Sequence, residues 1–118
     1  HTILGMYRNA KTIVWLHGEI KTPPFSMEAR IKTGHYLRLL QEGKIVRMPK
    51  ARPMPSIGQR CLELRINDTN CIWRVICAID DANIVVLDIF SKKPRSTPNH
   101  VIKKCKKRLN EYISEKLG

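Results

Sequence analysis

The sequence predicts a single small α+β domain, in which about four antiparallel strands form a sheet packed by helices. Four runs are strand-like, with apolar residues that alternate or follow one another: 12–16, 60–66, 72–79 and 84–93. Short, turn-rich connections separate the last three runs, which favours antiparallel hairpins. Helical periodicity occupies two further segments, at about 26–42 and from 97 to about 113.

The first half of the chain predicts one strand and one helix. The strand Thr12–Leu16 is bounded by Gly18, and Ser26 caps a helix that Gly43 stops. One face of this helix carries its mostly apolar residues: Ala29, Thr33, Tyr36, Leu37 and Leu40. Residues 1–10 show no pattern, and we expect them to be a flexible N-terminus or a remnant of expression.

Residues 44–59 contain three prolines and predict a loop, with a short strand near Ile45–Val46. Such a basic loop is either a connector or a flap that contacts phosphates, and the sequence leaves both open. Thr97 is the expected cap of the last helix, with Pro98 at its first position. The apolar stripe of this helix is Ile102, Cys105, Leu109, Tyr112 and Ile113.

The charge of the chain indicates an anionic partner. Twenty-two Lys and Arg against ten Asp and Glu give a net charge of +12. Nucleic acid is the leading prediction, and an anionic membrane or an acidic protein are the alternatives. The two stretches 44–60 and 92–108 contain basic residues and no acid, and we expect the second to form a folded basic surface.

The four cysteines predict no metal site, because they form no C-x-x-C pair and no His lies at zinc-finger spacing. We expect them to be buried hydrophobes or free thiols in a reducing cytoplasm. No signal-peptide pattern and no apolar run of membrane-spanning length is visible. The expectation is a cytoplasmic protein without metal, cofactor or membrane contact.

Alternation along the strands predicts that Glu63, Arg65, Arg74 and Asp88 gather on one exposed face of the sheet, provided the hairpin registers align. Two interpretations remain open. These residues either form cross-strand charge pairs on a solvated face, or present fixed positive charge to a phosphodiester backbone.

From about Thr12 to Tyr112 the chain resembles the HigB-like, phage-derived branch of the RelE/ParE toxin superfamily. The resemblance rests on motifs in a fixed order: Leu62-Glu63-Leu64-Arg65, then Trp73-Arg74-Val75, then the apolar strand that ends Phe90-Ser91-Lys92-Lys93, then Thr97-Pro98 before a basic helix.

The resemblance implies a single toxin domain over 1–118, with helices on one side of an antiparallel sheet. It also implies a toxin that cuts mRNA on the ribosome and is neutralised by a cognate antitoxin. Arg65, Arg74, Lys92 and Lys93 match the family's catalytic and RNA-contacting positions. Four further basic residues are predicted RNA contacts: Lys50, Arg52, Arg60 and Arg95.

In the implied reaction, a ribose 2′-OH attacks the adjacent phosphorus and the 5′-oxygen leaves, which requires no metal. Arg74 is the first choice and Arg65 the second for stabilising the phosphoryl charge. The acid and base match no firm motif, and the candidates are His100, Tyr112, Glu63 and Asp88. The periodicity favours core packing for Tyr112, and a surface role for His100 is the simpler alternative. A lysine of the pair 92–93 with a depressed pKa is another candidate.

Two rival functions share the same pattern. A ParE-like toxin that poisons DNA gyrase has this scaffold and needs no acid–base pair. A basic nucleic-acid-binding domain without catalysis would also explain the charge.

Overall fold

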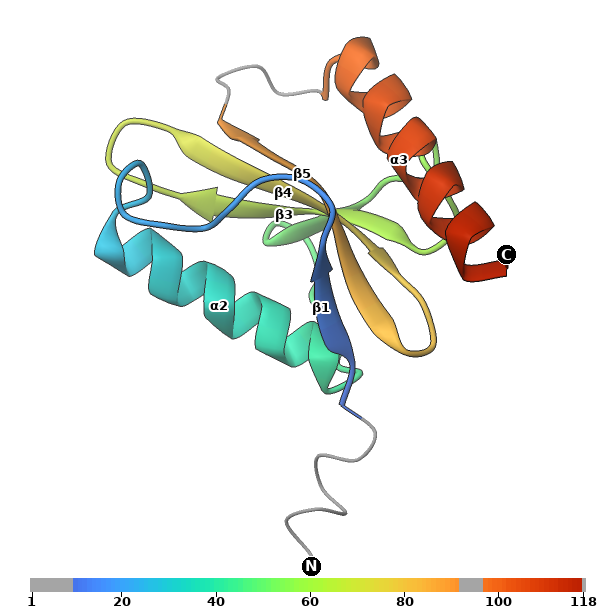
Figure 1. Cartoon of the computed structure of the whole chain (residues 1–118). Coiled ribbons are helices and arrows are strands. Elements are labelled where there is room, and N and C mark those ends of the chain that lie inside the picture. Colours follow the sequence, from blue (N-terminus) through green and yellow to red (C-terminus); the bar gives the residue numbers. More distant parts are fainter. Residues whose placement is uncertain (1–9, 92–96, 118) are drawn as a thin grey trace, which may run out of the picture.

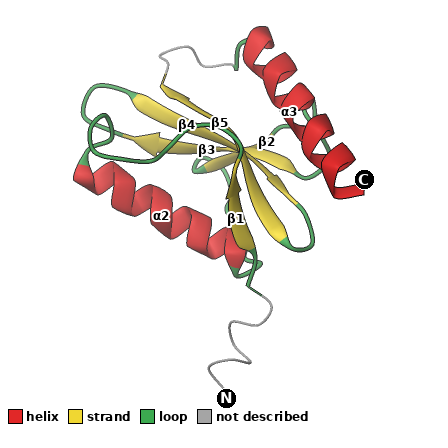
Figure 2. Cartoon of the chain, viewed as in Figure 1, coloured by secondary structure: helices red, strands yellow, loops and turns green. Residues whose placement is uncertain are grey.

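The computed structural model describes residues 10–91 and 97–117, which form one domain with a central sheet and two helices (Figures 1 and 2). The predicted α+β class is confirmed. Residues 1–9 of the expected N-terminal extension lie outside the described residues. The elements in chain order are β1 (Thr12–Trp15), α2 (Met27–Gln41), β2 (Ala51–Pro53), β3 (Cys61–Asn67), β4 (Ile72–Ile79), β5 (Asn83–Ser91) and α3 (Asn99–Leu117).

The sheet has five strands within the described residues, in the order β1-β5-β4-β3-β2. It is mixed rather than fully antiparallel, because β1 pairs with β5 in parallel. The run from Ile84 to Leu87 explains this difference. All four of its residues are 0% exposed, and a strand that is apolar on both faces is stable only in the middle of a sheet. β5 therefore needs a second neighbour besides β4.

The two helices cover opposite faces of the sheet, which corrects the expectation that both lie on one side. α2 packs Tyr36, Leu37 and Leu40 into one core, which includes Val75 and Val86. α3 packs against a second core, and its buried residues are Val101 and Cys105. Figure 1 shows the sheet between the two helices. The reason lies in β4 and β5, whose side chains are apolar on both faces and need cover on both.

The ends of α2 agree with the sequence prediction. The Ser26 hydroxyl accepts a hydrogen bond from the Ala29 N–H at 3.0 Å, as an N-cap does. Gly43 follows the helix with φ of +78°, a conformation that glycine adopts without steric cost. The five residues predicted to face the core are all buried.

A β-bulge in β5 changes which residues share a face. Ile76 of β4 pairs with Asp88, whereas the next residue, Cys77, pairs with Val86. Leu87 is therefore an extra residue in β5, and it joins the core under α3. Ile89 was predicted on the same face as Leu87, but it packs against the core under α2. The bulge explains both this error and the position of Asp88 on the α3 side.

Three local predictions are wrong. No strand forms at Ile45–Val46; the loop instead supplies the edge strand β2, where Pro53 is tolerated at the end of a strand. Thr97 is not the residue directly before the helix, because α3 begins at Asn99, and its hydroxyl donates a hydrogen bond to Glu63. On α3, Ile113 is 44% exposed and Val101 is buried instead.

Candidate functional site

Glu63 is the centre of a charged cluster on the α3 side of the sheet. Its Oε1 accepts a hydrogen bond from Arg65 Nε at 3.1 Å and lies 3.5 Å from an Arg74 guanidinium nitrogen. Its Oε2 accepts a hydrogen bond from the Thr97 hydroxyl at 2.5 Å. Two guanidinium groups and one hydroxyl therefore hold a single carboxylate in place.

The cluster is buried, which corrects the expectation of an exposed charged face. The side chain of Glu63 is 0% exposed and that of Arg74 is 3% exposed, whereas that of Arg65 is 29% exposed. Asp88 is also buried. α3 covers this face, and Thr97, just before it, is bound to Glu63. Of the two arginines, Arg65 is thus the one that a ligand in solvent can reach.

Strand register explains why a carboxylate is needed here. Arg65 and Arg74 are direct cross-strand partners in β3 and β4, and two like charges in this arrangement destabilise a sheet. Glu63 lies two residues before Arg65 and therefore on the same face, where its charge offsets this repulsion. Arg52 of β2 is the cross-strand partner of Glu63 and is half-buried.

Arg65 also lines a cavity of about 370 Å³ at the edge of the sheet. The predicted RNA contact Lys50 lines the same cavity, together with Lys32 and Tyr36 of α2. The Lys50 ammonium lies 6.0 Å from the centre of the Tyr36 ring, within the range of a cation–π interaction. Two of the predicted binding residues, Arg65 and Lys50, are therefore neighbours in the structure.

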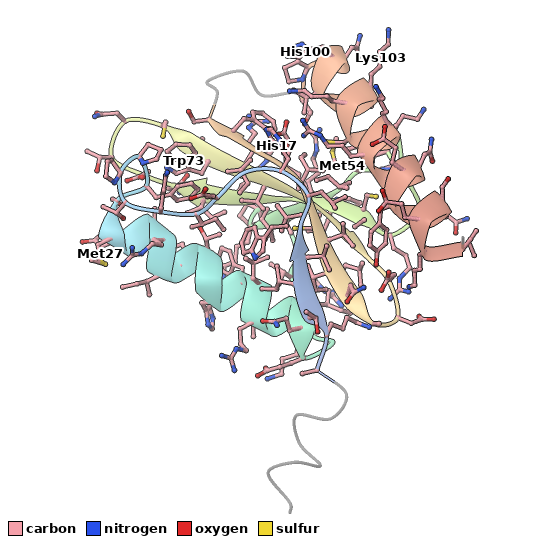
Figure 3. All side chains as sticks on the ribbon, in the orientation of Figure 1. His17, Met27, Met54, Trp73, His100 and Lys103 are labelled. Atoms are coloured by element: carbon pink, nitrogen blue, oxygen red, sulfur yellow. The ribbon has the colours of Figure 1, made fainter. Side chains whose placement is uncertain are left out.

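Asp68 and Trp73 support one end of this region. The Asp68 carboxylate accepts hydrogen bonds from the Ser26 N–H at 2.9 Å and from Trp73 Nε1 at 2.8 Å. These bonds, the Ser26 N–H first, hold the pKa of Asp68 well below its usual range. Trp73 stacks on Phe25 with ring centres 4.1 Å apart. Figure 3 shows Trp73 beside the start of α2, near Met27. The β3–β4 hairpin is thereby tied to α2.

A second carboxylate on the same face, Asp88, also attracts several cations. Its oxygens lie 3.4 Å from Arg108, 3.8 Å from Lys104 and 3.8 Å from His17. The side chains of Lys104 and His17 are about half exposed. Asp88 and Glu63 are both cross-strand partners of Ile76, so they lie two strands apart, roughly 10 Å by the usual strand spacing.

Two predicted site residues lie at the other end of the sheet. Tyr112 donates a hydrogen bond to the Asp80 carboxylate at 2.6 Å and accepts one from Asn83. Burial alone would raise the pKa of Asp80, but hydrogen bonds from Tyr112, Lys116 and two backbone N–H groups hold it well below its usual range. Arg60 pairs there with the exposed Asp81 at 3.3 Å. Neither Tyr112 nor Arg60 lies beside Arg65.

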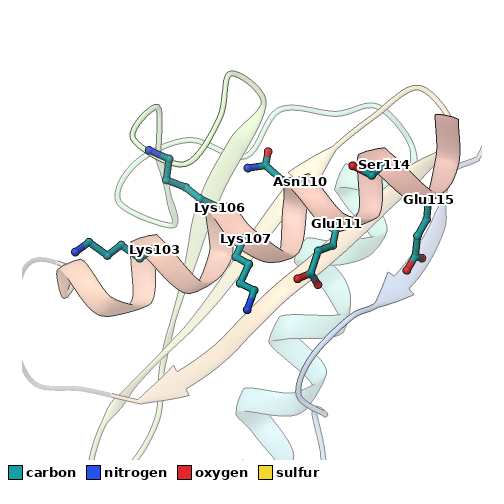
Figure 4. A pocket seen from close by; sticks show the side chains of 7 residues that line it. All are labelled: Lys103, Lys106, Lys107, Asn110, Glu111, Ser114 and Glu115. Atoms are coloured by element: carbon teal, nitrogen blue, oxygen red, sulfur yellow. The ribbon is translucent and has the colours of Figure 1, made fainter. Parts of the chain in front are cut away.

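His100 is exposed in the first turn of α3, three residues after Thr97 (Figure 3). The outer surface of α3 carries lysines in its first half and carboxylates in its second half, as Figure 4 shows for Lys103, Lys106, Glu111 and Glu115. The basic surface predicted for the start of this helix is therefore present. The candidates Lys92, Lys93 and Arg95 lie outside the described residues.

The family model for "Phage derived protein Gp49-like (DUF891)" matches residues 24–110. The chain belongs to this family. It is a toxin-like family of the RelE/HigB kind, and the matched range contains every motif on which the resemblance rests. No curated protein matches the Gp49-like chain. In the described part of this family member, no helix is long and apolar enough to cross a membrane.

Sequence reasoning missed several residues of this Gp49-like site. Thr97 was interpreted only as a helix cap, and Lys32 and Tyr36 only as parts of an amphipathic helix. The spacing of Lys32 and Tyr36 carried a usable signal, because residues four apart lie on the same side of a helix. Nothing in the sequence indicated that this side lines the same cavity as Arg65, since that depends on how α2 crosses the sheet.

Proposed function

We propose that this protein is the toxin of a toxin–antitoxin pair and that it cleaves messenger RNA on the ribosome. The observation that carries the proposal is the position of Arg65. The fully buried Glu63 carboxylate lies 3.1 Å from the Arg65 guanidinium, and the residue Arg65 lines a cavity together with Lys32 and Lys50. Membership of a toxin-like family supports the toxin assignment. The net charge of +12 supports a polyanionic target.

The proposed reaction is a transesterification within the RNA backbone. The ribose 2′-oxygen forms a bond to the adjacent phosphorus, and the bond from phosphorus to the 5′-oxygen breaks. Negative charge increases on the phosphoryl oxygens as the new bond forms. A guanidinium that is already oriented stabilises that charge without reorganising during the reaction. Arg65 performs this role because Glu63 fixes its orientation.

The other members of the cluster position Arg65. Arg74 is 3% exposed in its side chain, so in this proposal it fixes Glu63 instead of contacting RNA. His100 is our candidate for proton transfer, since an imidazole suits this task near neutral pH. It is exposed and follows Thr97 by one helical turn. Lys92 and Lys93 remain candidates for contact with the scissile phosphate.

The proposed partner is a cognate antitoxin, expected to be an acidic protein. A polycation that binds ribosomal and messenger RNA is most simply neutralised by a partner of opposite charge, which competes for the same surface. The gene next to the one for this chain is the place to look for it. Co-expression with that neighbour should abolish growth inhibition by this chain, whereas co-expression with an unrelated acidic protein should not.

Cell-free translation tests the proposed activity. Purified protein is added to an extract with a defined message, and the 5′ ends of the RNA are mapped by primer extension. We expect cleavage only when ribosomes are present. An intact message together with double-strand breaks in DNA would instead indicate a gyrase poison. Intact message and intact DNA with salt-sensitive RNA binding would indicate a binding domain without catalysis.

Arg65→Ala tests the residue that carries the proposal. Losing one preorganised donor to a developing anion lowers the rate by about 10²–10³-fold. Arg38→Ala is the matched control, because Arg38 is exposed on α2 and lies about 200° around the helix from Tyr36 at 100° per residue. The control should cleave at the wild-type rate. Equal rates for Arg65→Ala and wild type would contradict the assignment.

A further inference from the structure

The cavity beside Arg65 lies where the sheet edge is open. β2 pairs only with residues 62–64 of β3, and the next contact along this edge is the hydrogen bond from the Arg65 N–H to the Lys50 carbonyl at 2.8 Å. Within the described residues, Ile66 and Asn67 have no strand beside them on this side. α2 passes below this gap and contributes Lys32 and Tyr36, one helical turn apart.

The lining combines positive charge with a few apolar surfaces. Three of the residues that line the cavity are basic, namely Lys32, Lys50 and Arg65, and none of its described lining residues is acidic. Pro49 and Ile72 supply exposed apolar groups, and Asn67 is exposed beside them. The volume of about 370 Å³ lies within the range of small-ligand pockets, which typically combine apolar walls with a few convergent polar groups.

We infer that this cavity seats one nucleotide of the RNA substrate, with its phosphate at the basic lining residues and its base against Ile72 and Pro49. The inference rests on the proposed function in taking RNA as the ligand. Single-stranded RNA is usually recognised in this way, through a contacted phosphate and a base that is unstacked from its neighbours. The volume of about 370 Å³ favours one nucleotide over a broad contact with a membrane or a protein surface.

Asn67 gives this cavity a means of selecting the base. Its side-chain amide presents both a donor and an acceptor, and it lies at the end of β3 beside Ile72. An amide can form two hydrogen bonds to one base edge, which discriminates among bases. The nucleotide preference of the cavity therefore depends on Asn67, whereas its affinity for RNA of any sequence depends on the cations.

A binding measurement tests the inference separately from cleavage. The probe is a fluorescent six-nucleotide RNA with 2′-O-methyl groups, which lacks the attacking hydroxyl and stays intact. The variant Lys32→Ala/Lys50→Ala should weaken its binding at least tenfold at 0.1 M salt. The matched control is Lys21→Ala/Lys44→Ala, which removes the same charge from two exposed lysines that pair with neighbouring glutamates. The control should weaken binding less than twofold.

Equal weakening by the two double variants would overturn the inference, because it would show that only overall charge matters. Absence of binding by the wild-type protein would overturn it as well. Lys32 and Lys50 are exposed, so both double variants should fold, and thermal unfolding checks this. The ribosome assay decides the proposed function independently. Tight binding that depends on Lys32 and Lys50, together with no cleavage in the ribosome assay, would support nucleotide binding in the cavity and contradict the proposed nuclease activity.

Probes that differ at one base test the role of Asn67. The wild-type protein should prefer one base at one position by at least fivefold, and Asn67→Ala should reduce that preference below twofold while affinity for the other bases changes little. No preference in the wild-type protein, or the same preference in the variant, would refute base selection by Asn67.

Discussion

The two faces of the sheet are equally buried but differ in chemistry. Under α2, the strands contribute only apolar side chains, such as Leu64, Val75 and Val86. Under α3, apolar residues such as Ile76 share the face with Glu63, Arg74 and Asp88. Burying ion pairs adds little stability compared with well-packed apolar residues. The buried charged residues under α3 are therefore better explained by the need to hold Arg65 in one position, as expected of a functional site.

Removing the central carboxylate should have the largest effect. Glu63→Ala leaves the nearly buried Arg74 without this counter-charge, and we expect the free energy of unfolding to fall by about 3–5 kcal/mol. Urea denaturation measures it. The neighbouring Leu64→Ala, on the α2 face, should cost about 2–5 kcal/mol through a cavity. The two variants should differ in activity, because only Glu63→Ala should lose RNA cleavage per folded molecule.

Replacing both buried charged residues with leucine separates their effect on stability from their effect on activity. In Glu63→Leu/Arg74→Leu, both buried charges are gone, and we expect the variant to be at least about 3–5 kcal/mol more stable than Glu63→Ala, because replacing a whole buried ion pair is neutral or stabilising. Cleavage should remain lost, since nothing then orients Arg65. Full activity in this double variant would show that the buried charged residues do not serve the site.

Asp88→Asn should have a smaller effect than Glu63→Ala. The side chains of its cationic neighbours, His17, Lys104 and Arg108, are 20–51% exposed and can turn to water. An ion pair with a solvent-accessible cation is typically worth about 0.2–1 kcal/mol, so losing three should cost about 0.6–3 kcal/mol. The control is Asp81→Asn, an exposed carboxylate paired only with Arg60 among the interactions described, which should change the free energy of unfolding by less than about 0.5 kcal/mol. If urea denaturation gave the same loss of unfolding free energy for both variants, the buried Asp88 would contribute no more to stability than the exposed Asp81, contrary to our expectation.

Tyr112→Phe should cost about 1–2 kcal/mol, because it removes the partly exposed hydrogen bonds that the hydroxyl donates to Asp80 and accepts from Asn83. The effect should depend on pH. The folded pKa of Asp80 is lowered, so its contribution is complete above its ordinary pKa of about 3.9 and decreases as the pH falls further. Thermal unfolding at pH 7 and at pH 3 should show a smaller difference between Tyr112→Phe and wild type at the lower pH. If the stability difference between the variant and wild type were the same at both pH values, Asp80 would not be the group through which the Tyr112 hydroxyl stabilises the fold.

The sequence predicted the helices and strands well, but it predicted less well which side chains share a face of the sheet and which are buried. Periodicity identified the helix α2 with both its ends and all of its buried residues, because these depend on local spacing. It failed where it placed Leu87 and Ile89 on one face, because a single extra residue in β5 reverses the alternation of side chains and leaves no local signal. Whether α3 would cover the face that carries Glu63 depended on long-range packing, so Arg74 was expected to be exposed when it is buried.

The reactivity of the cysteines compares the two faces of the sheet with the least disturbance. It reports whether water reaches each thiol, and it requires no change to the fold. Cys77 packs in the core under α2, and Cys61 and Cys105 pack in the core under α3. Burial raises the pKa of all three thiols, to about 12 for Cys77 and Cys105 and about 11 for Cys61. A thiol that stays protonated reacts slowly with disulfide reagents. Cys71 is partly exposed at the β3–β4 hairpin.

In native protein at pH 8, one thiol, Cys71, should therefore react rapidly with a chromogenic disulfide, and the other three only on unfolding. Cys71→Ser should abolish the rapid phase, which is the control for its assignment. If Cys61 and Cys105 reacted fast and Cys77 did not, water would reach the core under α3, where the buried charged residues lie. Arg74 and Glu63 would then be solvated, and the buried ion pair could no longer explain how Arg65 is held.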